Sequence, residues 1–371
     1  MALSPFRDEE QAALQRVADL ERENTELRAA LAKERDVAAA ASVRATLGPL
    51  AAARPSLVVA IAVVCAATVT GVVTARLPTT SERPSAAQPS TSLASRSDAQ
   101  WRPLTTSTRT LRAATAIGGG GGAVLLGGEG ALVRFGIGDN DGDDAIPERL
   151  PALRGIAGQR GNLFAVGERG TILAEGAGRT WKPERAAHDT ELRAVTASSD
   201  GAWAVGKKGT ILRRRGESWV PEDSGTTRDL NGAARTADGV YVVGASGTIL
   251  VRRAGRTSWA EEPSGLAADL LAAFQQDGVV YAVGKGGAIV RRARDGWVRE
   301  ASGTLQDLYA VGGDGQAIYA VGAAGTILRS LGAGVWHVED GHTTGDLLCV
   351  AGAGELVYAA GEGGTLLRRS F

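Results

Sequence analysis

The chain has 371 residues, in which 41 lysines and arginines balance 41 aspartates and glutamates. A neutral chain lacks the overall positive field that attracts nucleic acid, so we expect no nucleic-acid partner. Two cysteines, Cys65 and Cys349, exclude a disulfide framework or a cysteine-based metal site, and the three histidines have no ligand spacing. We therefore expect no cofactor, and the 51 glycines point instead to many tight turns.

Residues 8–37 form the first predicted element, a helix without Gly or Pro that is rich in Ala, Leu, Glu and Arg. The heptad positions a and d are filled by Val17, Asn24 and Leu31 and by Leu20 and Leu27. A lone Asn at an a position favours a parallel dimer, because two Asn side chains pair across the helix interface. We expect a parallel homodimer through residues 13–31, with a solvated single helix as the alternative because three heptads are few.

Residues 56–75 carry no charge, and about 20 apolar residues match the thickness of a bilayer core. A signal peptide is the competing interpretation, but residues 1–54 are too long to precede one. We expect a transmembrane helix over residues 55–76, most simply in a bacterial inner membrane. A small excess of Lys and Arg before the span favours a cytoplasmic N-terminus and a periplasmic or extracellular C-terminal domain.

Residues 77–98 are dominated by Pro, Ser, Thr and Ala. This composition cannot bury a hydrophobic core. We expect a semi-extended linker between the membrane helix and the rest of the chain.

From residue 125 onward a motif such as "AVGKKGTIL" (204–212) recurs. Its first glycines are Gly127, Gly167, Gly206, Gly244, Gly284, Gly322 and Gly361. A regular period of about 39 residues indicates a solenoid, a propeller or another array. Each period holds four strand-sized segments, for example "LRAV" (192–195), "AWAVG" (202–206), "GTILRR" (209–214) and "SWVPE" (218–222). Four strands per period and seven periods predict an all-β, seven-bladed propeller over residues 99–371.

The two glycines of each motif predict a hairpin turn that needs a left-handed residue. The segment Gly206–Gly209 is not a phosphate-binding loop, because its lysines precede the second glycine and a strand follows it rather than a helix. The residues between the glycines vary freely from copy to copy. Lying on one face of the ring, they offer a candidate binding surface that includes Glu168, Arg169, Lys207, Lys208 and Lys285.

Ring closure is predicted from a missing strand. The seventh period ends after its third strand, whereas Trp101 aligns with the tryptophans of the outer strands, such as Trp219. We expect residues 99–104 to supply the outer strand of the last blade. In the first blade, which has no such Trp, we expect the outer strand at residues 145–150.

Basic residues follow the third strand in five of the seven copies, at Arg134, Arg213, Arg291, Arg329 and Arg368. One interpretation is a partial basic rim that binds an anionic partner. The alternative is cross-strand pairing with the glutamates that stand three residues after each outer-strand Trp, such as Glu222.

Asp139, Asp141 and Asp143 have the alternate spacing of a calcium-binding loop. The loop glycine and the bidentate acid at the twelfth position are missing, so an acidic hairpin tip is the alternative. The sequence shows no nucleophile elbow and no Cys/His pair, and no pair of acids stands out.

The combination of "AVGxxGTIL", Trp, "SGT" and "LxAV" resembles the BNR/Asp-box and photosystem II assembly-factor-like propellers of the wider YVTN/WD-repeat-like superfamily. The resemblance covers residues 99–371 and implies protein binding by a face of the propeller. The stretch "AEGAGRTW" (174–181) keeps Gly178, Thr180 and Trp181 of the Asp box but lacks its Ser and Asp, so no sialidase site residue transfers.

We therefore expect a membrane-anchored propeller that acts as a non-catalytic binding or scaffolding module for a protein or an envelope polymer. The alternative is a propeller enzyme, a glycan hydrolase or lyase, with its site at the central channel.

Overall fold

The computed structural model describes residues 100–104, 109–117, 123–136, 142–143, 151–159, 161–186, 188–199, 201–332, 334–353 and 356–370. The predicted coiled coil (8–37), membrane helix (55–76) and linker (77–98) lie outside these residues. Within them, no helix combines the length and the apolarity needed to cross a bilayer.

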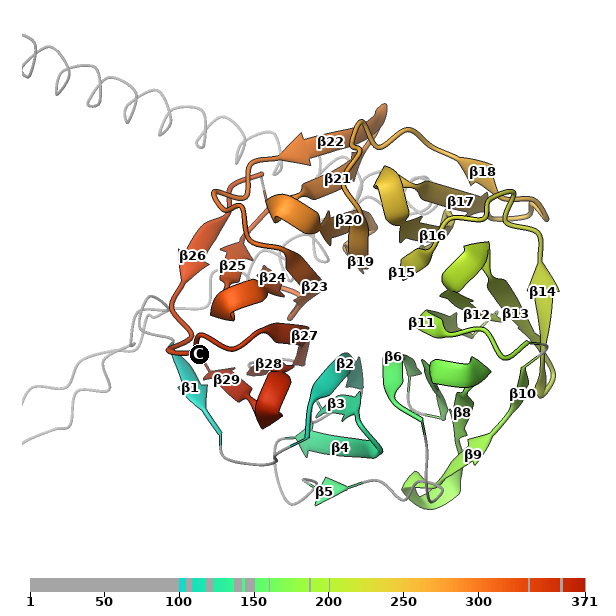
Figure 1. The fold of residues 1–371 in the computed structure, drawn as a ribbon, viewed down its shortest axis with the longest axis horizontal. Helices are drawn as coiled ribbons and strands as arrows, with labels where there is room; N and C mark the ends of the chain where they lie inside the picture. Colours follow the sequence, from blue (N-terminus) through green and yellow to red (C-terminus); the bar gives the residue numbers. More distant parts are fainter. Residues whose placement is uncertain are drawn as a thin grey trace, which may run out of the picture. The chain divides into compact units, whose positions relative to one another are not determined.

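Seven β-sheets stand around a central axis like the blades of a propeller (Figure 1). Blade 1 consists of β2 (Leu111–Ile117), β3 (Ala123–Gly128), β4 (Ala131–Gly136) and β5 (Gly142–Asp143). Blade 2 consists of β6 (Leu153–Gln159), β7 (Asn162–Gly167), β8 (Ile172–Glu175) and β9 (Trp181–Pro183). Blade 3 consists of β11 (Leu192–Ser198), β12 (Gly201–Gly206), β13 (Ile211–Arg215) and β14 (Ser218–Glu222), with β10 (Arg185–Ala186) added in parallel to β14.

The remaining blades repeat the same order from the axis outward. Blade 4 consists of β15 (Leu230–Thr236), β16 (Gly239–Gly244), β17 (Ile249–Arg253) and β18 (Ala260–Glu261). Blade 5 consists of β19 (Leu270–Gln276), β20 (Val279–Gly284), β21 (Ile289–Ala293) and β22 (Gly296–Glu300). Blade 6 consists of β23 (Leu308–Gly313), β24 (Ile318–Gly322), β25 (Ile327–Ser330) and β26 (His337–Glu339). Blade 7 consists of β27 (Leu347–Ala353), β28 (Leu356–Gly361), β29 (Leu366–Ser370) and β1 (Trp101–Pro103).

The second strands are buried because each sheet is covered on both faces by its neighbours. All six residues of β16, for example, are buried. The apolar residues of the second and third strands therefore follow one another without alternation, as in other sheets buried on both faces. The clusters of buried side chains join adjacent blades, so burial of apolar surface holds the ring together.

The Gly-x-x-Gly segments form short 3₁₀ turns between the second and third strands. They are η2 (Glu168–Gly170), η4 (Lys207–Gly209), η5 (Ala245–Gly247), η6 (Lys285–Gly287), η7 (Ala323–Gly325) and η8 (Glu362–Gly364). A further 3₁₀ turn, η3 (Ala177–Arg179), precedes β9. In η4 both Lys208 (φ 55°) and Gly209 (φ 69°) are left-handed, so the turn uses two such residues in succession where the sequence predicted one.

The two glycines are required for different reasons. Gly206 has an extended backbone, but a Cβ at this position would lie 2.0 Å from the carbonyl oxygen of Glu191. Gly209 is left-handed, and its Cβ would lie 1.9 Å from the carbonyl oxygen of Thr226. The first glycine therefore reports close contact with the segment that enters the same blade, and the second reports close contact with the segment that leads into the next blade.

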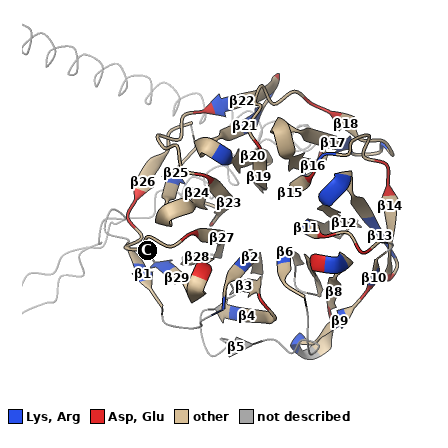
Figure 2. Cartoon of the chain, in the orientation of Figure 1, with Lys and Arg blue, Asp and Glu red and all other residues tan. Residues whose placement is uncertain are grey.

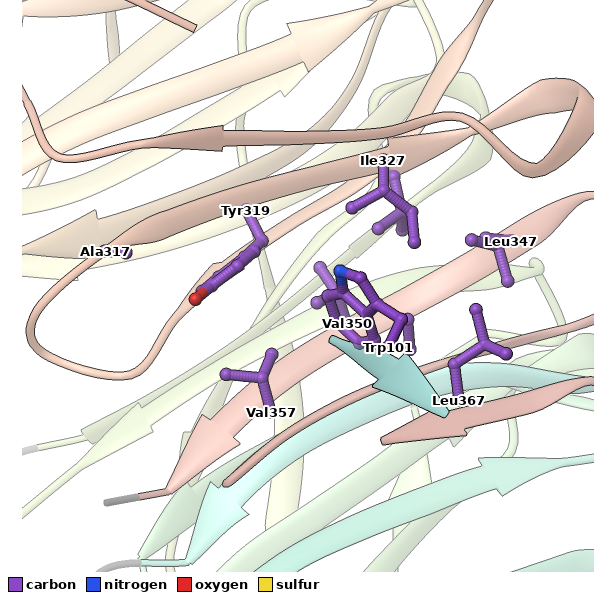
Figure 3. Close-up of a cluster of buried hydrophobic side chains, with 10 residues drawn as sticks. Trp101, Ala317, Tyr319, Ile327, Leu347, Val350, Val357 and Leu367 are labelled. Carbon is purple, nitrogen blue, oxygen red and sulfur yellow. The ribbon is translucent and has the colours of Figure 1, made fainter. Parts of the chain in front are cut away.

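The predicted ring closure is confirmed. Strand β1 pairs antiparallel with β29, with Trp101 opposite Arg369, and so completes the last blade with residues from the other end of the described chain. The Trp101 ring is buried in a cluster with Leu347, Leu367 and Tyr319, whose ring it meets edge-on at 5.9 Å (Figure 3). The strand begins at Trp101 rather than at residue 99.

The prediction for the outer strand of blade 1 was wrong. This strand is β5, and Gly142 and Asp143 lie opposite Arg134 and Val133 of β4. Both residues belong to the segment that the sequence assigned to a hairpin tip, whereas residues 145–150 lie outside the described part of the chain. Among the described residues, β5 contributes two paired residues to this blade.

Candidate binding site

A channel with a cavity volume of about 810 Å³ runs along the axis of the ring. It is lined by the inner strands β2, β6, β11, β15, β19, β23 and β27, which surround the axis in Figure 1. Each inner strand is the end strand of its sheet and pairs on one side only. Part of the wall is therefore made of strand edges, whose backbone N–H and C=O groups have no ladder partner. The volume lies within the range of about 300–1,000 Å³ that ligand pockets occupy.

The second residue of each inner strand lies at one end of the channel, and we call these seven residues the entrance ring. They are Arg112, Arg154, Arg193, Asn231, Leu271, Tyr309 and Leu348. The entrance ring is at the same end as the Gly-x-x-Gly turns, because the first residue of β11, Leu192, lies opposite Gly206. Blades 1–4 thus contribute a basic and polar half, and blades 5–7 contribute a largely apolar half. Figure 2 shows basic residues (blue) on β2 and β6, two of the strands that surround the axis.

The three arginines of the entrance ring differ in their partners. Arg193 is held by Glu191 and Asp229, each at 3.1 Å, and donates to the side chain of Asn231 at 2.5 Å. Arg154 pairs with Glu168 at 2.6 Å, but its buried Nε has no hydrogen-bond partner among the described residues. For Arg112, no ion pair connects its guanidinium to a carboxylate of the described chain.

The variable turn residues surround the entrance ring and form ion pairs with the neighbouring loops. Lys207 pairs with Glu191 at 3.0 Å. Burial raises the pKa of Glu191, but hydrogen bonds from Lys207 and Arg193 outweigh this effect and hold the pKa below its ordinary value. Lys285 pairs with Asp269 at 2.8 Å and lowers the pKa of that carboxyl. Glu168 takes part in the Arg154 pair.

The middle residue of these turns is bound by its backbone. The N–H of Lys208 donates to the Asp229 carboxylate at 3.0 Å. The same contact recurs from Ser246 to Asp269, from Gly286 to Asp307 and from Ala324 to Asp346. The sequence analysis missed these aspartates, although each stands directly before the first leucine of an inner strand. They fix these four turns to the beginning of the next blade through the backbone, so the Lys208 side chain takes no part in this contact.

Three of the five rim arginines pair with a glutamate of the adjacent outer strand. Arg213 lies 3.7 Å from Glu222, Arg291 lies 2.7 Å from Glu300, and Arg329 lies 3.8 Å from Glu339. These three pairs match the cross-strand alternative, whereas Arg134 pairs with Glu175 of the next blade at 2.9 Å. Arg368 is half-buried in β29, and it forms no ion pair within the described residues. Binding of an anionic partner at the rim stays a prediction.

Five glutamates, which we call the seam glutamates, also connect blades. They are Glu184, Glu222, Glu262, Glu300 and Glu339. The indole of the following blade donates to each of them: Trp219, Trp259, Trp297, Trp336 and Trp101, respectively, at 2.7–3.0 Å. In four of the five, an arginine of that following blade adds an ion pair: Arg214, Arg252, Arg292 or Arg369. The sequence predicted the pairing within a blade but not this pairing between blades.

The contact between blades 7 and 1 departs from this pattern. Leu104 stands three residues after Trp101, where blades 2–6 have a seam glutamate. The contact is apolar instead: Phe135 stacks on Tyr358 at 5.4 Å, and Leu104 and Leu111 pack in the same cluster. Cys349 is buried there, and burial raises the pKa of its thiol to about 12.

The candidate calcium ligands are only partly described. Asp143 lies in β5, whereas Asp139 and Asp141 fall outside the described residues. Within the part of the chain that the structure describes, no three His, Cys, Asp or Glu side chains cluster as a metal site.

No protein-family model matches the sequence, and no curated protein matches it either. Many solved structures share the fold. Ycf48 bound to a D1 peptide is 17% identical with a TM-score of 0.58, covering 74% of this chain and 95% of that one. Virginiamycin B lyase from Staphylococcus aureus is 12% identical with a TM-score of 0.65, covering 74% and 99%. The WD40 propeller domain of Doa1 is 12% identical with a TM-score of 0.60, covering 73% and 96%.

The chain folds as a seven-bladed β-propeller. Its expected resemblance to assembly-factor-like propellers is confirmed at the level of the fold, since Ycf48 from Cyanidioschyzon merolae also matches it, with a TM-score of 0.57, 14% identity and coverage of 72% of this chain and 98% of that one. At these identities the similarity shows the fold alone.

Proposed function

We propose that the chain is a non-catalytic binding module that holds a protein partner at the entrance ring. The observation that carries the proposal is the division of this ring into a basic half and an apolar half around an open channel. Such a surface offers charge-assisted hydrogen bonds beside apolar contact area, which is the combination that gives protein interfaces their specificity. Structural neighbours include a propeller bound to a peptide and a WD40 propeller.

The alternative, a glycan hydrolase or lyase at the central channel, is favoured by one neighbour that is a lyase. Most glycoside hydrolases need a pair of carboxylates at the scissile bond. The residues that line the described channel include no Asp, Glu or His, so we favour binding over catalysis. Turnover of a glycan panel by the full-length chain would reverse this preference.

We further propose that residues 55–76 anchor the chain in a membrane, and that residues 13–31 join two chains on its cytoplasmic side. Both proposals rest on the sequence: an uncharged apolar stretch, and heptads with a single Asn24. Two propellers on one tether would raise the effective concentration of the second binding event, so that weak individual contacts suffice. Protease protection in membrane vesicles tests the orientation, and Asn24→Val tests the dimer through its effect on oligomer mass.

The test of binding is a comparison of variants of the full-length chain, solubilised in detergent. Tyr309→Ala removes part of the apolar half, and Arg112→Gln removes charge from the basic half. Arg299→Gln, on the exposed face of β22, is the matched charge control. We expect cross-linked partner to fall at least fivefold in the first two variants and to stay unchanged in the control. Equal capture by all four proteins would reject the entrance ring as the binding site.

A further inference from the structure

The large apolar side chains that are exposed in the described part of the chain gather in one sector of the ring. They belong to blades 5 and 6 and are Val298, Leu305, Leu331, Val335 and Val338. Leu305 lies beside η6, because a Cβ on Gly287 would come within 2.1 Å of the carbonyl oxygen of Thr304. The other four, which we call the apolar patch, are 45–71% exposed on the outer edge of the ring. A cluster of this kind marks an interaction surface.

One contact between blades 5 and 6 brings the apolar patch together. The indole of Trp336 donates to Glu300 at 2.8 Å, so the end of β22 meets the segment that begins β26. Val298 stands two residues before Glu300, and Val338 stands two residues after Trp336. Both valines therefore flank the same point on the outer edge.

The hairpin between β25 and β26 supplies the other half of the patch. Residues 331–335 (LGAGV) carry no charge, whereas the corresponding hairpins of blades 2–5 contain charged residues, namely Arg179, Glu217, Arg256, Arg294 and Asp295. A Cβ on Gly334 would lie 3.5 Å from Oε1 of Glu300, so this hairpin packs against blade 5. Leu331 and Val335 thus lie beside the two valines.

The charges that face outward around the patch are mainly basic. The outer strands β22, β26 and β1 expose Val298, Arg299, His337, Val338, Arg102 and Pro103. In these described strands no exposed residue is acidic, because Glu300 is buried, Glu339 is half-buried, and both accept a hydrogen bond from an indole. Two exposed acids, Asp295 and Asp340, stand just outside the strands. Apolar and basic side chains together suit a surface that is apolar inside and anionic outside.

The patch is also next to the point at which the chain enters the propeller. Trp101, the first residue of β1, donates to Glu339, which follows Val338 at the end of β26. Figure 1 shows β22, β26 and β1 following one another along the outer edge of the ring. Only residues 77–98 separate the proposed membrane helix from this entry point, so an anchored chain would keep this edge near the bilayer. Tethering raises the effective concentration of the two surfaces, and a weak contact then suffices.

A bilayer fits this surface better than a folded protein does. Stable protein interfaces use about 20–30 residues on each side. The apolar patch has four large side chains on a convex edge, which is too little for such an interface. A bilayer takes up individual apolar side chains at the boundary between headgroups and acyl chains, and anionic lipids attract neighbouring Arg side chains.

We propose that the apolar patch binds the surface of the bilayer in which the chain is anchored. Its four side chains enter the headgroup region, and Arg102 and Arg299 lie at the level of the lipid phosphates. The outer edge of blades 5 and 6 then rests on the membrane, while the entrance ring, on the axis, stays open to a partner. This assignment rests on the proposed membrane anchor, and the two are tested separately.

The test uses the full-length chain in vesicles of phosphatidylcholine and phosphatidylglycerol in equal parts. Leu331→Cys carries a nitrobenzoxadiazole label in a Cys65→Ser background, and Cys349 stays unlabelled because it is buried. Lipids with a nitroxide near the headgroup quench a label that lies at the bilayer surface. Glu217→Cys, in the exposed outer hairpin of blade 3, is the matched control. We expect quenching to be at least fivefold greater for the Leu331→Cys label than for the control label.

Charge placed in the patch provides a second test. Val298→Asp/Val338→Asp, added to the labelled Leu331→Cys chain, should lower the quenching at least threefold, because carboxylates are repelled by anionic lipid and costly to bury. Ala260→Asp, on the exposed outer strand of blade 4, adds the same charge elsewhere and should leave the quenching unchanged. All three side chains are exposed, so melting temperatures should stay within about 3 °C of the unchanged protein.

Three outcomes overturn the assignment. They are equal quenching of the two labels, an emission of the Leu331→Cys label that is typical of water, and an apolar emission that nitroxide lipids do not quench. In the last case a protein covers the patch, such as a second copy of this chain. Alkaline extraction of the vesicles tests the anchor itself: release of the chain would reject both proposals, whereas a retained chain with an unquenched label would reject only the patch.

Discussion

The contact between blades 3 and 4 and the contact between blades 7 and 1 hold the same fold together by different means. In the first, Glu222 accepts hydrogen bonds from Trp259 at 3.0 Å and Trp203 at 3.3 Å and lies beside Arg252. In the second, Leu104 takes the place of the glutamate and an aromatic stack joins the blades. Hydrogen bonds fix the angle between two blades, whereas apolar contact is not directional. The angle between blades is thus fixed by hydrogen bonds at the contact of blades 3 and 4. At the contact of blades 7 and 1, where the two ends of the ring meet, the apolar packing allows more variation in this angle.

The largest effect is expected from removal of the closing strand. Deletion of residues 100–104 exposes the edge of β29 and removes Trp101 from its buried cluster. Truncation of a buried Trp alone costs about 3–5 kcal/mol. We expect the melting temperature of the full-length chain in detergent to fall by roughly 10 °C or more. Trp101→Phe, which keeps most of the packing but loses the bond to Glu339, is the control and should cost far less.

The next prediction compares how much each of the two contacts contributes to the free energy of unfolding. Glu222→Ala leaves two indole N–H groups and nearby guanidiniums without their acceptor, and we expect a loss of about 3 kcal/mol in the free energy of unfolding. Leu104→Ala removes part of a half-buried side chain and should cost about 1–2 kcal/mol. Denaturant unfolding of both variants measures the difference. Equal losses would mean that the seam glutamates add no more stability than apolar packing does.

Cys349 provides a probe for the opening of the contact between blades 7 and 1. With a pKa of about 12 and complete burial, its thiol should react with a maleimide only when the contact opens. In a Cys65→Ser background, we expect Phe135→Ala to accelerate labelling at least tenfold and Glu222→Ala to change it less than threefold. Equal acceleration by the two variants would show that the ring opens as one unit.

The smallest effect concerns pH. The folded-state pKa of Glu191 lies below its ordinary value of 4.5, so its stabilising effect is complete above pH 4.5 and is lost as pH falls through the folded-state pKa. Lys207 is partly exposed, so the pair is worth only about 0.5 kcal/mol. Lys207→Ala should therefore lower stability slightly at pH 7, and this loss should shrink as pH falls below 4.5 through the folded-state pKa. A loss that does not shrink on acidification would assign the effect to packing of the lysine.

Much of the fold could be predicted from the sequence because the motif occurs seven times, so that its constant and variable positions can be compared. The two glycines recur in every copy while the positions of Lys207 and Lys208 hold different residues, which identifies a turn. Trp101 aligns with the outer-strand tryptophans but precedes the first repeat, which identifies the closing strand. Blade 1 was mispredicted because its outer strand, Gly142–Asp143, has neither the Trp nor the apolar pattern of the others. The position of β5 is set by its pairing with β4 rather than by the strand propensity of its residues.

The candidate site was harder to foresee. The second residue of each inner strand is not the same type in all blades, so no repeated pattern marks Arg112 and Tyr309 as parts of one site. Only the closing of the ring brings them to one entrance. The pairing of seam glutamates with the next blade was missed for the same reason, since it depends on how sheets pack rather than on the hairpin of one sheet.

The closing strand also has a consequence for how the molecule is made. Trp101 precedes every repeat, but its partner β29 follows all the other strands of the propeller. Six blades can form from local hairpins while the chain is still growing, but the seventh must wait until β29 has been made. Until then the first residues of the domain stay unpaired, and their exposed indole is open to chaperones and to neighbouring chains. Synthesis of β29 is thus the step that allows the ring to close.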